Sequence, residues 1–247
     1  MKLRTKLVIL YAFVTTFIIV VVGWVFHVRI WDYRLNSIHD DMMNELKHVD
    51  FALNAFFLDV ESDVRNLVAN EAVRSRNDSN FTNFLHADEK NFQYHIGDSE
   101  QKIIDIFNNY LHTHSYVNSV YMGRENGSFV RSHKRQRPTR YDPRQRPWYK
   151  LAKNNPSLVM KTEAYPSLTT SDVNIGVVKA LVDKKGSIFG VVGVDVTLEK
   201  LTKYIANIQI NPEGRIVLMD REGLVLAGLG KEMLFKSVDS HAPGLLK

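Results

Sequence analysis

The sequence predicts an α+β protein in which an apolar helix leads into a long amphipathic helix and then into an antiparallel sheet. Three observations support this prediction. Residues 7–26 form an uncharged and mostly apolar run, and apolar side chains then recur every three or four positions over residues 35–67. Two hairpin signals follow, each with apolar arms around a turn that ends in glycine.

The apolar run at 7–26 has the length needed to cross a bilayer core of roughly 30 Å. Basic side chains precede it at Lys2, Arg4 and Lys6. Because positive flanks tend to stay in the cytoplasm, we expect a cytoplasmic tail at 1–6, a transmembrane helix at 7–27 and an extracytoplasmic remainder. A cleaved signal peptide is the alternative, but the run is longer than is usual for one and lacks a small-x-small cleavage pattern.

A single apolar stripe follows the predicted span. Its members are Leu35, Ile38, Met42, Leu46, Val49, Leu53, Phe56, Val60, Val64 and Leu67. Steps of three and four positions predict one continuous helix, to which we assign residues 28–74. At a rise of 1.5 Å per residue, the stripe alone spans roughly 50 Å. Such a helix can serve as a spine, as the seam of a homodimer, or as both.

Residues 75–206 are predicted to form a sheet domain. After a polar stretch, a helix is expected at 100–111. The first hairpin pairs 117–123 with 128–132 around an Asn-Gly turn, and the second pairs 173–182 with 187–196 around a Lys-Gly turn. A short extended run is predicted at 159–165, and Thr197 is placed to cap a helix that ends near residue 205.

The nine residues from Tyr141 to Tyr149 are the most informative part of the chain. Arg146 offers the planar fork of donors that matches a carboxylate, while the Trp and Tyr side chains can wall a pocket and still donate into it. Pro147 suits the first position of a short helix. No nucleophile–base pair stands beside this block, so it predicts recognition rather than catalysis.

The last forty residues repeat an earlier pattern. Residues 215–227 echo the strand–turn–strand plan of 120–132, so we expect a second, related sheet domain to begin at 207–247. This segment is too short for a complete domain of that kind, and the sequence is therefore expected to be a piece of a longer protein. The chain has no cysteine, so its fold cannot depend on disulfides.

Several classes of partner are not expected. The net charge of +5 could suit nucleic acid, but the basic residues gather at 133–146, a short proline-containing stretch rather than a helix face. His112 and His114 form a His-x-His pair without a third ligand nearby in the sequence, so neither a metal nor another cofactor is predicted.

The order of these elements resembles the double Cache sensor domains of bacterial transmembrane receptors. The resemblance is carried by Val120-Tyr-Met-Gly123, by the Tyr141–Tyr149 block and by Gly190-Val-Val-Gly-Val-Asp195-Val196. It implies a PAS-like, membrane-distal domain at 75–206 that binds a small ligand, and a signal that passes along the long helix. The segment 207–247 would begin the membrane-proximal domain.

Within that family, the block resembles the amino-acid-binding subgroup. The resemblance implies six binding residues, Tyr141, Arg146, Trp148, Tyr149, Tyr165 and Asp195. It assigns the ligand carboxylate to Arg146 and Trp148, with Tyr149 nearby. It assigns the ammonium to Asp195, with Tyr141 and Tyr165. Some relatives carry an additional acid just after the tyrosine at 165, where this chain has Pro166-Ser167, so the ammonium site would depend on Asp195.

Two of these residues have simpler interpretations, since Asp195 could cap the helix that follows it and Tyr165 could be ordinary sheet packing. The expected function is the periplasmic sensor region of an inner-membrane receptor that binds a free α-amino acid and dimerises through the long helix. One alternative is a receptor for an amine or a dicarboxylate. Others are a membrane-tethered enzyme, which the lack of a readable catalytic constellation disfavours, and an assembly module without a ligand. An output domain, such as a chemotaxis signalling domain or a histidine kinase, would lie outside this sequence.

Overall fold

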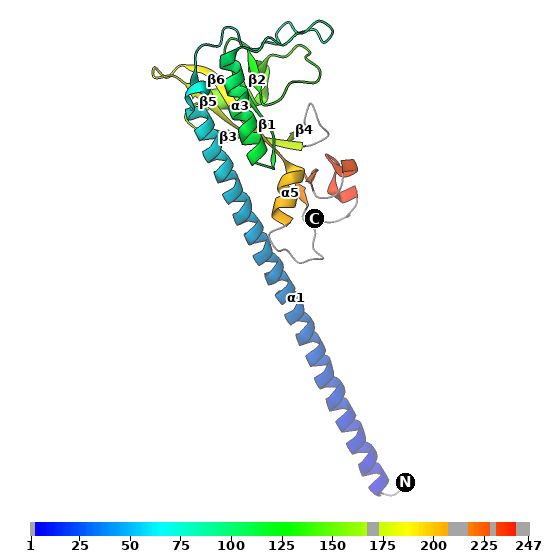
Figure 1. Ribbon diagram of the computed structural model, residues 1–247. Coiled ribbons are helices and arrows are strands. Elements are labelled where there is room, and N and C mark those ends of the chain that lie inside the picture. Colours follow the sequence, from blue (N-terminus) through cyan, green and yellow to red (C-terminus); the bar gives the residue numbers. More distant parts are fainter. Residues whose placement is uncertain (1–2, 167–172, 207–216, 228–230, 241–247) are drawn as a thin grey trace. The chain divides into compact units, whose positions relative to one another are not determined.

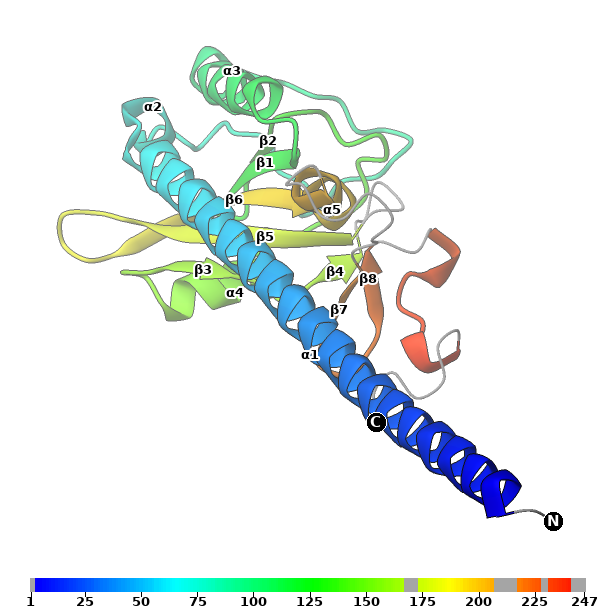
Figure 2. The same cartoon turned by 90° about the horizontal axis from the view of Figure 1, so that it is seen from below.

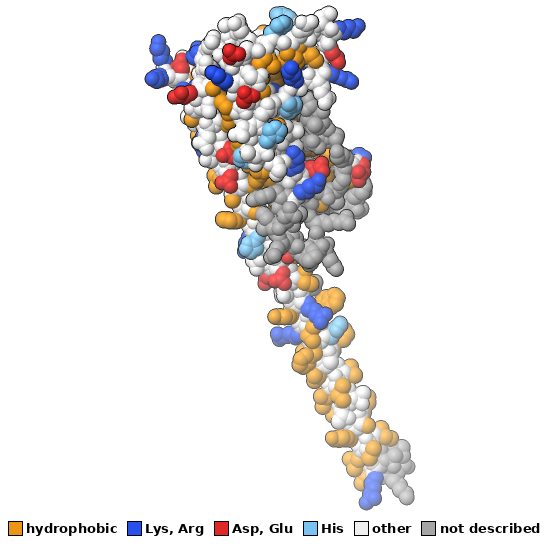
Figure 3. Space-filling model, viewed as in Figure 1, with side chains coloured by type: hydrophobic (Ala, Val, Ile, Leu, Met, Phe, Trp, Pro, Cys, Tyr) orange, Lys and Arg blue, Asp and Glu red, His pale blue; other side chains and the backbone are white. Residues whose placement is uncertain are grey.

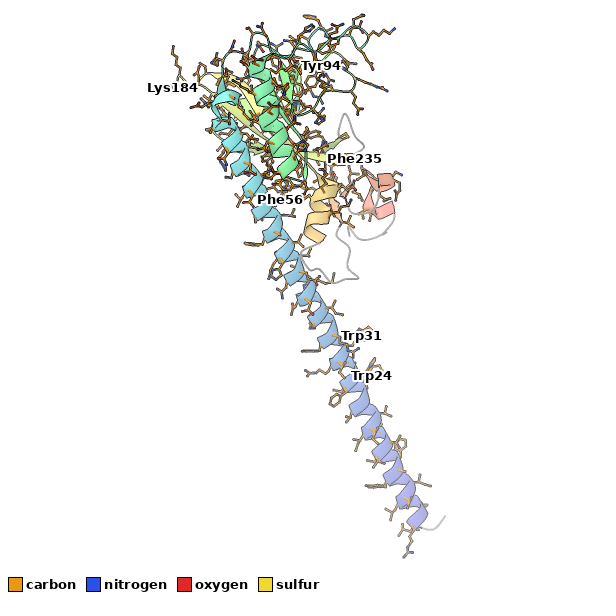
Figure 4. All side chains as sticks on the ribbon, viewed as in Figure 1. Trp24, Trp31, Phe56, Tyr94, Lys184 and Phe235 are labelled. Atoms are coloured by element: carbon orange, nitrogen blue, oxygen red, sulfur yellow. The ribbon has the colours of Figure 1, made fainter. Side chains whose placement is uncertain are left out.

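The computed structural model describes residues 3–166, 173–206, 217–227 and 231–240. Helix α1 (Leu3–Ala69) is continuous, and the chain divides into two compact units, Met1–Phe51 and Ala52–Lys247. The first unit is the N-terminal part of α1. Its apolar side chains are exposed, and Trp24 and Trp31 project from it (Figures 3 and 4). By length and composition, this part of α1 is able to cross a membrane.

The second unit begins with the last turns of α1, which bury one apolar face. Its members are Phe56, Val60, Val64, Leu67 and Val68. Phe56 stacks edge-on against Tyr116, with ring centroids 4.7 Å apart. The predicted stripe thus packs against the sheet domain over this part of the helix. The helix ends at Ala69, where the side chain of Asn70 accepts a hydrogen bond from the Ala72 N–H (3.0 Å) and caps the short helix α2 (Glu71–Arg74).

An antiparallel sheet forms the centre of the second unit (Figure 1). Its strands are β1 (Val117–Arg124), β2 (Phe129–Arg131), β3 (Val159–Lys161), β4 (Tyr165–Pro166), β5 (Val173–Val182) and β6 (Ile188–Thr197). They run in the order β2-β1-β6-β5-β3, with β4 paired beside β3 on β5. Both predicted hairpins are present, and their turns place Gly127 and Gly186 at φ of 86° and 83°, which glycine adopts without strain.

Helices cover both faces of this sheet (Figure 2). Helices α1 and α3 (Asp98–Thr113) lie on one face, where the Tyr110 hydroxyl of α3 donates to Asp63 of α1 (3.0 Å). Helix α4 (Pro147–Asn154) lies on the other and follows the 3-10 turn η1 (Pro143–Gln145). Because successive strand residues point to opposite faces, Tyr121, Phe129, Val178 and Val191 meet α4 in one buried cluster.

The remaining elements are small. Helix α5 (Leu198–Ala206) follows β6 directly. Strands β7 (Leu218–Met219) and β8 (Val225–Ala227) form a hairpin, and the 3-10 turns η2 (Lys231–Met233) and η3 (Val238–Ser240) follow it. This hairpin is the predicted echo of the first. Residues 207–216, 228–230 and 241–247 lie outside the described residues, as do 167–172. The predicted α+β fold, with its long helix and antiparallel sheet, is confirmed.

Candidate ligand-binding site

A small cavity lies on the α4 side of the sheet. Its volume is about 70 Å³. Its lining residues are Ser119, Tyr121, Phe129, Arg131, Tyr141, Arg146, Trp148, Tyr165, Asn174 and Asp195. Five of the six residues predicted to bind the ligand are among them. Residues far apart in the sequence therefore meet at one place on the sheet.

Strand register builds the floor of the cavity. Tyr121 of β1 lies opposite Gly193 of β6 and Arg131 of β2, while Ser119 lies opposite Asp195. Residues two apart on one strand share a face, which brings these polar side chains to the same side of the sheet. Gly193 is required by this arrangement, because a Cβ there would overlap the ring of Tyr121.

The segment before α4 builds the opposite wall. Asp142 caps η1 by accepting from the Arg144 N–H (3.0 Å), and Pro147 occupies the first turn of α4. These caps fix where Arg146 and Trp148 leave the backbone. The indole of Trp148 meets the Tyr121 ring edge-on at 4.9 Å, and the Arg146 guanidinium lies 5.8 Å from the centroid of Tyr141.

Three hydroxyl groups converge on the carboxylate of Asp195. The phenols of Tyr121 (2.7 Å) and Tyr165 both donate to Oδ1, and the Ser119 hydroxyl donates to Oδ2 at 3.3 Å. Asp195 is 8% exposed, and burial raises the pKa of its carboxyl above the ordinary value, against the opposing effect of these hydrogen bonds and of Arg131. The longer bond at Oδ2 leaves this oxygen as the one best able to accept a further donor.

Two hydrogen bonds disagree with the simpler interpretations of Asp195 and Tyr165. Asp195 does not cap α5, because the Thr197 hydroxyl accepts from the Lys200 N–H (3.3 Å) in that role. Tyr165 is more than sheet packing, since its hydroxyl is bound to Asp195 within the cavity.

Charges of both signs line the cavity. Arg131 and Arg146 supply guanidinium groups, and Asp195 supplies a carboxylate. Burial lowers the pKa of the Arg131 guanidinium, and the negative charge of Asp195 opposes that shift. A pocket of this kind can pair an ammonium group and a carboxylate at the same time.

A comparison with known protein families identifies the fold. The sequence model of the Cache domain matches residues 32–242, which is most of the chain. The chain belongs to the Cache domain family. Curated relatives of this Cache domain include the methyl-accepting chemotaxis protein McpA of Pseudomonas putida, which is 34% identical over 126 residues, and McpB of Bacillus subtilis, 34% identical over 116. Those matches cover 51% and 47% of this chain but only 19% and 17% of the two receptors.

Solved structures of similar fold are ligand-binding domains of chemoreceptors. The ligand-binding domain of CtaA from Pseudomonas fluorescens, solved with L-serine, has a TM-score of 0.60 and is 22% identical in sequence. The match covers 85% of this chain and 80% of the CtaA chain. The ligand-binding domain of Tlp3 from Campylobacter jejuni, solved with 4-methylisoleucine, has a TM-score of 0.55 and 23% identity, with coverage of 79% and 71%. At these identities the likeness establishes the shared fold.

Tyr149 is the predicted residue that this Cache domain does not bring to the cavity. It follows Trp148 in α4, and neighbouring helix residues point about 100° apart because a turn takes 3.6 residues. Its ring is buried in the core, and its hydroxyl donates to Glu125 (2.9 Å). The Tyr149 side chain therefore anchors α4 and lies outside the cavity lining.

Five lining residues of the Cache domain were not predicted. They are Ser119, Tyr121, Phe129, Arg131 and Asn174. Strand alternation across the first hairpin contained a signal for four of them, since Ser119 and Tyr121 share one face of β1 and Phe129 and Arg131 share one face of β2. No local pattern predicted Asn174, because its position in the cavity lining depends on the register in which β5 pairs with β6.

Proposed function

We propose that this chain is the extracytoplasmic sensor region of a bacterial membrane receptor and that it binds a free α-amino acid in the cavity around Asp195. The observation that carries the proposal is the presence of Asp195 and Arg146 in the lining of one small cavity. The ligand ammonium would pair with Asp195 and the carboxylate with Arg146 and Trp148. An α-amino acid is the simplest molecule that carries both charges.

The energetics of desolvation favour this ligand class. A charge taken out of water without a partner costs several kcal/mol, so a zwitterion needs both of its charges paired. A pure amine would leave the guanidinium groups without an anion, and a pure carboxylate would meet Asp195. Tyr121 and Tyr165 add support, because their hydroxyls hold the Asp195 carboxylate in place before the ligand arrives.

The relatives support the same proposal. Proteins similar to this chain carry the names of chemotaxis receptors, and several similar folds were solved with amino acids bound, among them L-serine in CtaA and L-arginine in PctB of Pseudomonas aeruginosa. These facts concern those proteins, and they agree with the chemistry of the cavity described above. An enzymatic function has no comparable support among them.

The arrangement in the membrane is part of the proposal. The basic residues before position 7 would keep the N-terminus in the cytoplasm, and the sensor would lie in the periplasm, at the inner membrane of its host. The exposed apolar side chains of α1, including Ile38, Met42 and Leu46, suit a homodimer seam. We assign 75–206 to the membrane-distal domain and 207–247 to the start of the membrane-proximal one.

Two arginines near α4 provide a matched test. Arg146→Ala removes a guanidinium from the cavity, and we expect it to cost roughly 2–5 kcal/mol of amino-acid affinity, about 30-fold to several-thousand-fold in Kd. Arg144→Ala is the control, because Arg144 lies outside the cavity lining and donates to Asp142 (2.9 Å). Calorimetric titration with a panel of the common amino acids measures both. An Arg146→Ala protein that binds like the wild type would show that the carboxylate lies elsewhere.

A further inference from the structure

A second and larger cavity lies beside the first. Its volume is about 220 Å³, and it is formed between α3, the segment around Tyr94 and the residues that leave β2. Phe129 and Arg131 line both cavities and stand between them. Phe84 and Ile104 contribute apolar wall to the second cavity. None of the residues assigned above to the ammonium or the carboxylate of an amino acid lines this second cavity.

One end of the second cavity carries buried polar groups. Glu100 of α3 is 2% exposed, and its Oε2 accepts a hydrogen bond from the Thr82 N–H (2.9 Å). Burial raises the pKa of the Glu100 carboxyl. Thr82 is 8% exposed, and its hydroxyl lies near the Glu100 carboxyl without making a hydrogen bond of good geometry to any of the described residues. A buried hydroxyl that is poorly aligned with its neighbour costs stability, so a ligand group that reaches it in good geometry gains a hydrogen bond.

Basic side chains line the same cavity. They are Arg131, Lys134 and Arg135, whereas Glu100 supplies the only carboxylate among the residues that line this cavity. The Arg135 guanidinium lies over the rings of Phe84 and Tyr141, at 5.1 and 4.7 Å from their centroids, and its backbone N–H donates to the Tyr94 hydroxyl (2.9 Å). The Lys134 ammonium lies 5.2 Å from the centroid of Tyr94, which Figure 4 labels. These contacts hold both cations beside the cavity.

We propose that this cavity is a second ligand site and that it binds a small organic carboxylate with an apolar body and a hydroxyl group. The carboxylate pairs with Lys134 and Arg135, and the body packs between Phe84 and Ile104. The hydroxyl reaches the polar end, where it can donate to Glu100 and accept from Thr82. An ammonium in place of the hydroxyl can only donate, and the three cations of the lining oppose it.

The test uses hydroxylated probes and their deoxy partners. The full chain in lipid nanodiscs is titrated calorimetrically with 4-hydroxybenzoate and 6-hydroxyhexanoate, and then with benzoate and hexanoate. We expect saturable binding of at least one hydroxylated probe, at least tenfold tighter than its deoxy partner. Binding of neither hydroxylated probe, or equal binding of the deoxy partners, would overturn the proposal.

Three variants assign that binding to one cavity. Ile104→Trp fills the second cavity and should abolish binding of the hydroxylated probe, while Lys134→Met removes a cation from an exposed side chain and should weaken it at least tenfold. Arg146 lines the first cavity and not the second, although its charge acts on Arg135, so Arg146→Ala should weaken probe binding far less than Lys134→Met does. Lys134→Met keeps the test decisive if Ile104→Trp lowers the melting temperature. Probe binding that is lost in Arg146→Ala or unchanged in Lys134→Met would contradict the assignment.

Discussion

The substitution Asp195→Asn should affect amino-acid affinity and the stability of the ligand-free protein in different ways. Burial raises the pKa of the Asp195 carboxyl, whereas hydrogen bonds from Arg144 lower that of Asp142, which lies outside the cavity. The two aspartates therefore contribute to stability with opposite signs. We expect Asp195→Asn to weaken amino-acid binding strongly while leaving the ligand-free protein as stable as the wild type or more stable.

The sign follows from proton linkage. A carboxyl whose pKa is raised by folding binds its proton more tightly in the folded state, so its contribution to stability is full below the unfolded pKa and is lost as the pH rises through the folded one. Above that range, the ionised Asp195 carboxylate therefore makes a net unfavourable contribution to folding. Asn carries no charge, and its amide oxygen can still accept from the phenols of Tyr121 and Tyr165.

The loss of affinity has a definite size. Removing one partner of a desolvated charge pair costs roughly 2–5 kcal/mol, which raises Kd about 30-fold to several-thousand-fold. Calorimetry measures the affinity, and denaturant unfolding of the ligand-free protein measures the stability. Asp142→Asn is the control, because Asn can still cap η1 through its amide oxygen. Its free energy of unfolding should fall by at most about 1 kcal/mol through the lost ion pair with Arg144, with the affinity unchanged.

Two results would refute this reasoning. If Asp195→Asn binds amino acids with wild-type affinity, the ammonium does not pair with Asp195. If ligand-free Asp195→Asn is strongly destabilised while Asp142→Asn is not, then the Asp195 carboxylate stabilises the fold. In that case its burial does not lower the stability of the ligand-free protein, and the reasoning from its raised pKa is wrong.

Four further predictions follow from the same structure. Amino-acid affinity should fall as the pH is lowered through the raised pKa of Asp195, because the protonated carboxyl cannot form an ion pair with the ammonium, and titrations in buffers of different ionisation enthalpy should detect proton release on binding. Gly193→Ala should destabilise the fold by roughly 1–3 kcal/mol and weaken binding, since its Cβ overlaps Tyr121; normal affinity would contradict the described floor. Tyr149→Phe should leave Kd unchanged, and a clear loss would return this residue to the site. Arg124→Met should cost roughly 1–3 kcal/mol in denaturant unfolding, because the fully buried guanidinium donates to two backbone carbonyls at the end of α2, and a neutral effect would contradict that role.

Much of the fold could be predicted because its signals are local. The stripe of α1 is a matter of spacing, the hairpin turns are marked by glycines at positive φ, and α4 begins at a proline. The end of α1 was less visible. Asn70 interrupts a helical pattern that continues through 74, and only the cap that its side chain makes to Ala72 shows why.

The candidate site was harder to predict, because its parts meet through strand register and helix phase. Arg146 and Trp148 could be found from residue type, whereas Tyr149 lies outside the cavity lining because the phase of α4 turns its hydroxyl toward Glu125. Strand alternation places Tyr121 and Arg131 on one face of the first hairpin, but only the pairing of β1 with β6 brings that face to Asp195, a long-range fact that local patterns do not contain. The second cavity, with Glu100 at its polar end, left no readable pattern in the sequence.

The central claim is that the first cavity pairs both charges of a zwitterion, and one calorimetric comparison tests it most directly. An amino acid that binds the chain in nanodiscs is titrated beside its decarboxylated amine and its deaminated acid. The account predicts that each analogue binds at least 30-fold more weakly than the amino acid, because each leaves either Arg146 or Asp195 without its ionic partner. An amine or an acid that binds as tightly as the amino acid would contradict it.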